Sequence, residues 1–136
     1  MSLRYSFRKN QQGTSAIEFA FTAPIFMILI FVIIDAGLAL WTQFGLENGV
    51  EAAARCAVVT PTTCASQANI QSYAAANSLG ITVPGSTFTF TLASCGDQVS
   101  ASYPYAFYSR YLGAPSITLT AASCFPDAKR SHSSTG

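Results

Sequence analysis

The stretch GTSAIEFAFTAPIFMILIFVIIDAGLALW, residues 13–41, decides the fold of this 136-residue chain. It has no charged side chain between Phe19 and Ile34, and its apolar character continues past Asp35 to Trp41. Phe19 to Trp41 gives 23 residues, and a helix needs roughly 20 apolar residues to cross a bilayer core. The remaining chain is too short to enclose a helix that is apolar on every face. We therefore predict a single transmembrane helix.

The charge distribution predicts how this helix is oriented. Arg4, Arg8 and Lys9 precede the apolar run, and the next basic residue is Arg55. Because positive charge stays in the cytoplasm, we expect the C-terminal part of the chain to be exported. Without residues 1–13 the chain has four basic and six acidic side chains, a net charge of −2. That balance argues against a nucleic-acid partner.

All four cysteines lie on the side expected to be exported, which predicts two disulfides. Three pairings are possible, and we favour Cys56–Cys64, whose members flank a helix break, together with Cys95–Cys124. The second pair raises a difficulty, because its cysteines end the first and third strands of an expected meander. Either the strand order differs or the loops bring the two sulfur atoms together.

The helix should continue beyond the membrane to about Val58. Small residues recur there every four positions and would admit a close neighbour: Gly45, Gly49, Ala53 and Ala57. Charged residues fall on another face, most simply a solvated one: Glu47, Glu51 and Arg55. Pro24 lies inside the apolar run, so we expect a kink or a locally melted turn near Ala20, or else simple tolerance of the proline.

The rest of the chain predicts a small α+β head. A second helix is expected from Ser66 to Leu79, ended by Gly80. Its core-facing residues should be Ile70, Tyr73, Ala74 and Leu79. Alternation of apolar and polar residues then predicts three strands, near residues 87–92, 99–105 and 117–121, with Pro104 limiting the second to an edge or a bulge. The expected divisions are a basic cytoplasmic leader (1–13), the helix (14–58), the head (59–128) and a disordered tail (129–136).

No catalytic constellation is evident in the sequence. The one histidine, His132, lies in the polar tail, and we find no metal-ligand spacing and no phosphate-binding loop. We expect no enzyme activity, cofactor, metal or small-molecule substrate. One aromatic cluster is either a partner-binding patch or the core and rim of the head: Tyr103, Tyr105, Phe107, Tyr108 and Tyr111.

The start of the apolar run resembles the processing site of a type IV prepilin, with Gly13, then Glu18 and Phe19 in register. With its flanks, the segment to Val59 resembles the TadE-like family of pseudopilins from tight-adherence (Flp/Tad) pilus systems. The shared positions are Gly13, Ala16, Glu18, Phe19, Pro24, Asp35, Gly37 and the Ala-Ala-Ala-Arg run at 52–55.

This resemblance implies cleavage after Gly13 by a prepilin peptidase, which would leave a new α-amine on Thr14. It implies that Glu18 pairs with the N-terminal amine of a neighbouring subunit during assembly. Alternatively, Glu18 is an interfacial carboxylate favoured by the helix dipole. Asp35 either pairs with a partner protein or marks the membrane–water interface on the exported side. The implied partners are the peptidase, other pilins or pseudopilins, inner-membrane assembly proteins and membrane lipid.

The resemblance therefore predicts a minor pilin of the bacterial inner membrane, with a periplasmic head, that acts in pilus assembly or in the fibre. Two alternatives stay open. The chain could be a major structural pilin, although major pilins of this type are usually shorter. It could also be a membrane-anchored periplasmic binding module without a pilus role, which would not need the cut after Gly13.

Overall fold

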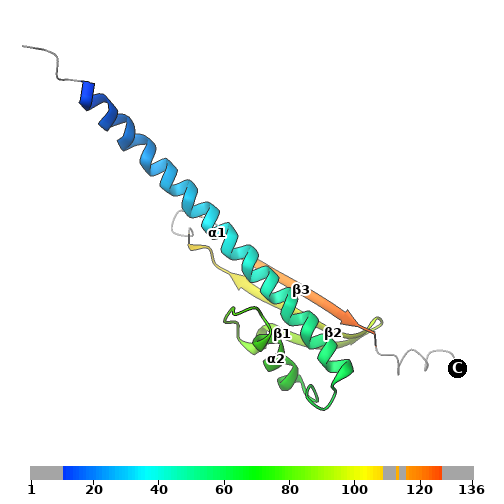
Figure 1. Ribbon diagram of the computed structural model, residues 1–136. Helices are drawn as coiled ribbons and strands as arrows, with labels where there is room; N and C mark the ends of the chain where they lie inside the picture. Colours follow the sequence, from blue (N-terminus) through cyan, green and yellow to red (C-terminus); the bar gives the residue numbers. More distant parts are fainter. Residues whose placement is uncertain (1–10, 109–112, 114–115, 127–136) are drawn as a thin grey trace, which may run out of the picture.

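The computed structural model describes residues 11–108, 113 and 116–126. Its elements are α1 (Gln11–Val59), α2 (Gln67–Ala76), a 3-10 turn (Gly85–Thr87), β1 (Phe88–Ala93), β2 (Gly96–Tyr105) and β3 (Ile117–Phe125). Figure 1 shows α1 as a long rod whose C-terminal half carries α2 and the sheet, which together form the head. The predicted α+β fold is confirmed. Some residues named in the sequence analysis lie outside the described part, namely Arg4, Arg8, Lys9, Tyr111, His132 and the rest of the 129–136 tail.

The helix α1 continues through Pro24 without a break. Proline has no amide hydrogen to give to the carbonyl of Ala20, four residues earlier. The residues around Pro24 stay helical, so the melted turn is not formed, and the kink expected near Ala20 stays a prediction. The nearby Thr22 hydroxyl donates a hydrogen bond of 2.9 Å to the carbonyl oxygen of Glu18, a bond to the preceding turn that Ser and Thr side chains make within helices.

One face of α1 contacts the head, and the residues on this face are spaced alternately four and three positions apart. This contact face comprises Asp35, Ala39, Thr42, Leu46, Gly49, Ala53 and Cys56. All are buried except Thr42, which is half-buried. Such spacing keeps successive side chains on one side of a helix, so the same stretch of α1 lies against the head over six turns.

The small residues of α1 are needed for this contact. A Cβ atom added at Gly49 would lie 2.6 Å from Ser78 Oγ and 2.9 Å from the carbonyl oxygen of Ala74. One added at Gly45 would lie 2.7 Å from a side-chain carbon of Ile81. The glycines therefore let α2 and the chain that follows it approach the backbone of α1. This close contact was predicted from the small residues that recur every four positions.

The sheet is antiparallel with the order β1-β2-β3. Its inner face packs against α1 and α2 through Phe88, Val99, Ala101 and Ala121. The prediction that Pro104 would limit β2 to an edge was wrong for the strand as a whole, since β2 is central. It holds locally, because β1 pairs with β2 only as far as Ala101. Beyond that point β2 has β3 alone as a neighbour, and a proline is tolerated there.

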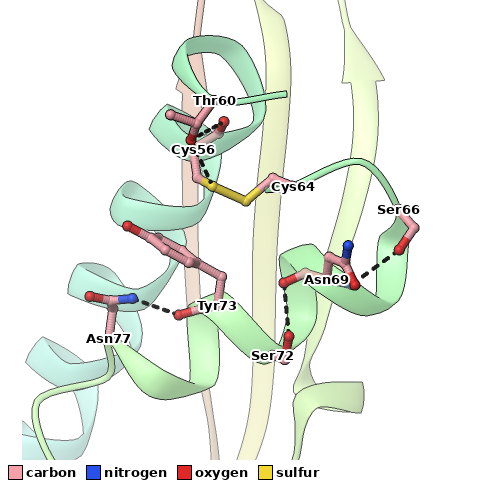
Figure 2. The surroundings of a disulfide bond; sticks show 8 residues. All are labelled: Cys56, Thr60, Cys64, Ser66, Asn69, Ser72, Tyr73 and Asn77. Atoms are coloured by element: carbon pink, nitrogen blue, oxygen red, sulfur yellow. Dashed lines mark hydrogen bonds between the residues drawn. A yellow bond between two sulfur atoms is a disulfide. The ribbon is translucent and has the colours of Figure 1, made fainter. Parts of the chain in front are cut away.

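The second helix is shorter than expected. It begins after Ser66, whose hydroxyl accepts the amide of Asn69 at 3.3 Å, and it ends at Ala76. The side-chain amide of Asn77 donates to the carbonyl oxygen of Tyr73 at 2.8 Å, in addition to the backbone amide of Asn77, which donates to the same oxygen at 3.1 Å. Figure 2 shows both caps.

This early end changes which residues reach the core. Ile70 and Ala74 are buried as predicted. Leu79, however, is 48% exposed and Tyr73 is 37% exposed. The backbone at Leu79 and Gly80 is left-handed, with φ of 50° and 76°, so the chain turns away before Leu79 can point inward. Ser78 is fully buried in its place and donates to the carbonyl oxygen of Ala74 at 2.7 Å.

Both predicted disulfides are confirmed. Cys56–Cys64 joins the end of α1 to the segment that follows it, with 5.9 Å between Cα atoms (Figure 2). Cys95 lies in the turn between β1 and β2 and bonds to Cys124 of β3. The turn carries its sulfur past the end of β2, which resolves the difficulty of the intervening strand. Loops of 8 and 29 residues predict stabilisation of about 2.5 and 3.6 kcal/mol through restriction of the unfolded chain.

We predict that Gly49→Ala lowers the free energy of unfolding of the head by about 1–3 kcal/mol, because the added methyl group overpacks a tight contact. Gly37→Ala is the matched control, since a Cβ there meets nothing within 4 Å and alanine favours a helix over glycine. Thermal unfolding of the full chain in detergent micelles measures both. Equal stability of the two variants would contradict the assigned role of Gly49.

Candidate functional site

The residues predicted for processing lie on the first turns of α1. Gly13 and Thr14 have helical backbone, and Glu18 and Phe19 are exposed, Phe19 by 71%. Thr14 precedes Glu18 by four residues, which is about one turn and a rise of about 6 Å. The carboxylate of Glu18 is therefore open to contact from outside the chain.

A long exposed apolar surface follows these residues. Side chains from Ser15 to Ile34 are exposed, apart from the half-buried Ala23 and Ile30. Within the described residues, Ser15–Val59 is the one segment long and apolar enough to cross a membrane. Its most apolar window is not buried at all by the rest of the chain. A helix that is apolar all round and uncovered could serve as a membrane anchor.

Asp35 marks the point where the head begins to cover α1. Its side chain is only 3% exposed, and its Oδ1 accepts a hydrogen bond of 3.0 Å from the backbone amide of Tyr108. A buried carboxylate is costly unless it is hydrogen-bonded, so this bond offsets part of that cost. Sequence reasoning offered a partner protein or the membrane interface as the surroundings of Asp35, and the structure adds a contact within the same chain.

The predicted aromatic cluster divides into core and surface. Tyr105 is buried at the end of β2, and its ring meets that of Phe107 edge-on, with centroids 5.2 Å apart. Tyr103 is half-buried, whereas Tyr108 is 78% exposed. Burial, and then the negative charge of Asp35, raise the pKa of Tyr105 above its usual value. Tyr105 belongs to the core of the head, and among the described members of the cluster Tyr108 is the exposed one.

A groove of about 450 Å³ lies where the end of β2 meets α1. Leu38, Trp41 and Thr42 line it from the helix, and Pro104 to Ala106 and Tyr108 line it from the head. The next residue of α1, Gln43, donates from its side chain to the carbonyl oxygen of Thr120 in β3 at 2.9 Å. Sequence reasoning missed Leu38, Thr42 and Gln43. The spacing of the contact face, traced back from Leu46 to Asp35, was the signal that could have found this region.

Among the described residues, no group of three or more His, Cys, Asp or Glu side chains is arranged to hold a metal ion. The exposed carboxylates Glu47 and Glu51 and the exposed Arg55 lie on the solvent side of α1, as predicted. Glu47 Oε1 accepts a hydrogen bond of 2.9 Å from Gln43 Nε2. The described residues instead form two surfaces along α1 that could contact other molecules, namely the exposed apolar segment and the groove beside the end of β2.

Comparison with known proteins gives one family. Residues 13–55 match the family model described as TadE-like protein. The match begins at Gly13 and ends at Arg55, so it covers the exposed apolar segment and most of the contact face but not the head. No curated protein and no solved structure matches the chain.

We predict that Asp35→Ala speeds hydrogen exchange at the Tyr108 amide by about tenfold or more, because a hydrogen bond to a charged group contributes about 1.5–3 kcal/mol. Asp35→Asn keeps a side-chain oxygen that can accept the bond, and it should restore much of the protection. Exchange followed by mass spectrometry on the peptide containing residues 103–108 measures this. Glu51→Ala, which removes an exposed carboxylate from the same helix, is the control. Unchanged exchange in Asp35→Ala would contradict the assigned contact.

Proposed function

We propose, taking the chain as TadE-like over residues 13–55, that it is a pseudopilin, a minor pilin that takes part in assembling a tight-adherence type IV pilus used for adhesion or surface attachment. The family match indicates association with a Tad pilus. The observation that carries the finer proposal is the register of the match, which starts at Gly13 and places Glu18 exposed near the start of the helix.

In this proposal a prepilin peptidase cuts after Gly13 and removes the basic leader, residues 1–13. The product starts at Thr14 with a charged α-amine and keeps its whole apolar helix. The chain would then be an inner-membrane protein with one span, its N-terminus cytoplasmic and its head periplasmic. The two disulfides of the head support this orientation, because disulfides form in oxidising compartments.

Glu18 then has an electrostatic role in assembly. The new amine lies one helical turn from Glu18 of its own chain, and it is open to Glu18 of a neighbour. Opposite charges attract more strongly at the rim of an apolar environment than in water. Pairing between subunits would therefore set the stagger of neighbouring helices, with other pilins or pseudopilins as the partners.

The exposed apolar surface of residues 15–34 supports the proposal that the chain moves from a lipid environment into contact with other subunits. In the membrane this surface is covered by lipid, and in a fibre it would be covered by the same segments of other subunits. Pro24 lies within it, and Asp35 ends it. We assign the chain a structural role without catalysis, in which the apolar segment assembles and the head is displayed.

The first test is the N-terminal sequence of the mature protein from membranes that contain the pilus peptidase. We expect it to start at Thr14, and Gly13→Leu should abolish the cut because the peptidase must accommodate the residue at that position. Gly37→Leu, a change at another glycine of α1 with open space around it, should be processed normally. A start at Met1 or Ser2 would favour the anchored binding module instead, and a start beyond Trp41 would make the apolar run a signal peptide.

The second test separates assembly from insertion. Glu18→Ala should leave membrane insertion intact but reduce assembled pili by about tenfold or more, since the loss of 1.4 kcal/mol of pairing is a factor of ten in an equilibrium. Glu51→Ala removes an exposed carboxylate from the head-bearing half of the same helix, and it should assemble like the unmodified protein. Pili counted by electron microscopy provide the measurement. Normal assembly of the Glu18 variant would remove the role given to this carboxylate.

A further inference from the structure

The uncovered part of α1 has the length of a bilayer core. Residues 15–34 are outside the head, and at 1.5 Å per residue they extend about 30 Å, which is the thickness of a hydrocarbon core. Asp35, the next residue, is already buried by the head. If the whole uncovered segment lies in the membrane, the near edge of the head lies at the membrane surface, with no stretch of bare helix between them.

The side chains at this edge suit the headgroup region of a bilayer. Trp41 is 57% exposed, Tyr108 is 78% exposed and Leu38 is 43% exposed. Trp41 lies about 9 Å beyond Asp35 along the helix, while the headgroup region adds about 5–8 Å on each side of the core. The side chains of a helix tilt toward its N-terminus, which here means toward the membrane. Tryptophan and tyrosine prefer this depth because each has an apolar ring and a polar group.

The charges at this edge agree with the assignment. The described residues that line the groove beside α1 are uncharged. The nearby carboxylate, Asp35, is turned into the junction and accepts the amide of Tyr108. That bond places Tyr108, three residues beyond the end of β2, level with the first covered turn of the helix. Among the described residues, this edge of the head is therefore aromatic and uncharged, and the carboxylate of Asp35 lies inside the junction.

From this geometry we propose that the edge formed by Leu38, Trp41 and Tyr108 sits in the headgroup region of the phospholipid leaflet on the head's side, so that the head rests on the bilayer. The occupant of the surface is lipid, because the edge is continuous with the apolar segment that lipid would surround. This inference rests on the membrane anchoring in the proposed function, and it adds a defined position of the head relative to the membrane.

Trp41 is the single tryptophan of the chain, which makes its fluorescence a direct probe. The full chain is reconstituted at high dilution in vesicles of phosphatidylethanolamine and phosphatidylglycerol that carry brominated lipids. Bromine is placed either near the headgroup or deep in the acyl chain, because it quenches tryptophan on contact. Three further probes are made in a Trp41→Phe background, namely Tyr108→Trp at the edge, Phe26→Trp within the span and Leu92→Trp in the distal part of the head. Leu92 pairs with Asp97, about 26 Å along β2 from Tyr105, and is 61% exposed.

We expect shallow bromine to reduce the emission of both Trp41 and the Tyr108→Trp probe, with a shift to shorter wavelength relative to the Leu92→Trp probe. Deep bromine should quench the Phe26→Trp probe most, and neither label should quench the probe at position 92. If position 26 is quenched but Trp41 and position 108 are not, the chain is anchored in the membrane, and the proposal that the head rests on the bilayer is wrong. If position 26 is not quenched, the membrane anchoring itself fails. Equal quenching at positions 108 and 92 would also overturn the proposal, because the head would have no defined edge toward the lipid.

Discussion

The contact between the small residues of α1 and the head is the interaction on which the rest of the structure depends. The sheet has three strands and only one apolar face, and that face needs a second layer. The C-terminal half of α1 supplies most of this layer together with α2. Gly45 and Gly49 let the polypeptide around Ser78 approach the helix backbone. Larger residues would hold the layers apart and expose the core around Phe88, so the same helix that is bare in its first half completes a core in its second half.

The head is held to α1 at three levels, which fixes its direction relative to the apolar segment. Asp35 binds the amide of Tyr108 at the near end, Gln43 binds the carbonyl of Thr120 in the middle, and Cys56 is bonded to Cys64 at the far end. Contacts distributed over six turns resist rotation of the head about the helix. In the proposed assembly through the helix, docking of α1 would therefore also orient the head.

Local sequence signals predicted much of this fold, and they failed where a longer-range contact competed with them. The period of two in residues 88–92 and 117–121 was sufficient to find β1 and β3, and the spacing of cysteines around helix and strand ends led to both disulfides. Leu79 was misplaced because α2 ends at Ala76 and the backbone at Leu79 and Gly80 is left-handed, whereas Tyr73 lies within α2 and is 37% exposed. Ser78, a polar residue, was drawn inward because only a small side chain fits against Gly49. The central position of β2 was not predicted, because Pro104 favours an edge strand. The sequence alone does not show that β1 stops pairing with β2 at Ala101, before it reaches the proline.

By itself, the sequence determined that a long apolar helix precedes a small disulfide-bonded α+β head, and it identified Gly13 and Glu18 as the residues to test for processing and assembly. The helix and the head follow from composition, periodicity and spacing, which are local properties, and Gly13 and Glu18 follow from the resemblance to a prepilin processing site. Only the tertiary structure decided that Asp35 is covered by the head, that Tyr105 belongs to the core while Tyr108 faces outward, and that the uncovered helix has the length of a bilayer core. The physical reason is that each of these depends on a contact between residues more than sixty positions apart, and the energy of such a contact is set by the packing of the whole head on α1.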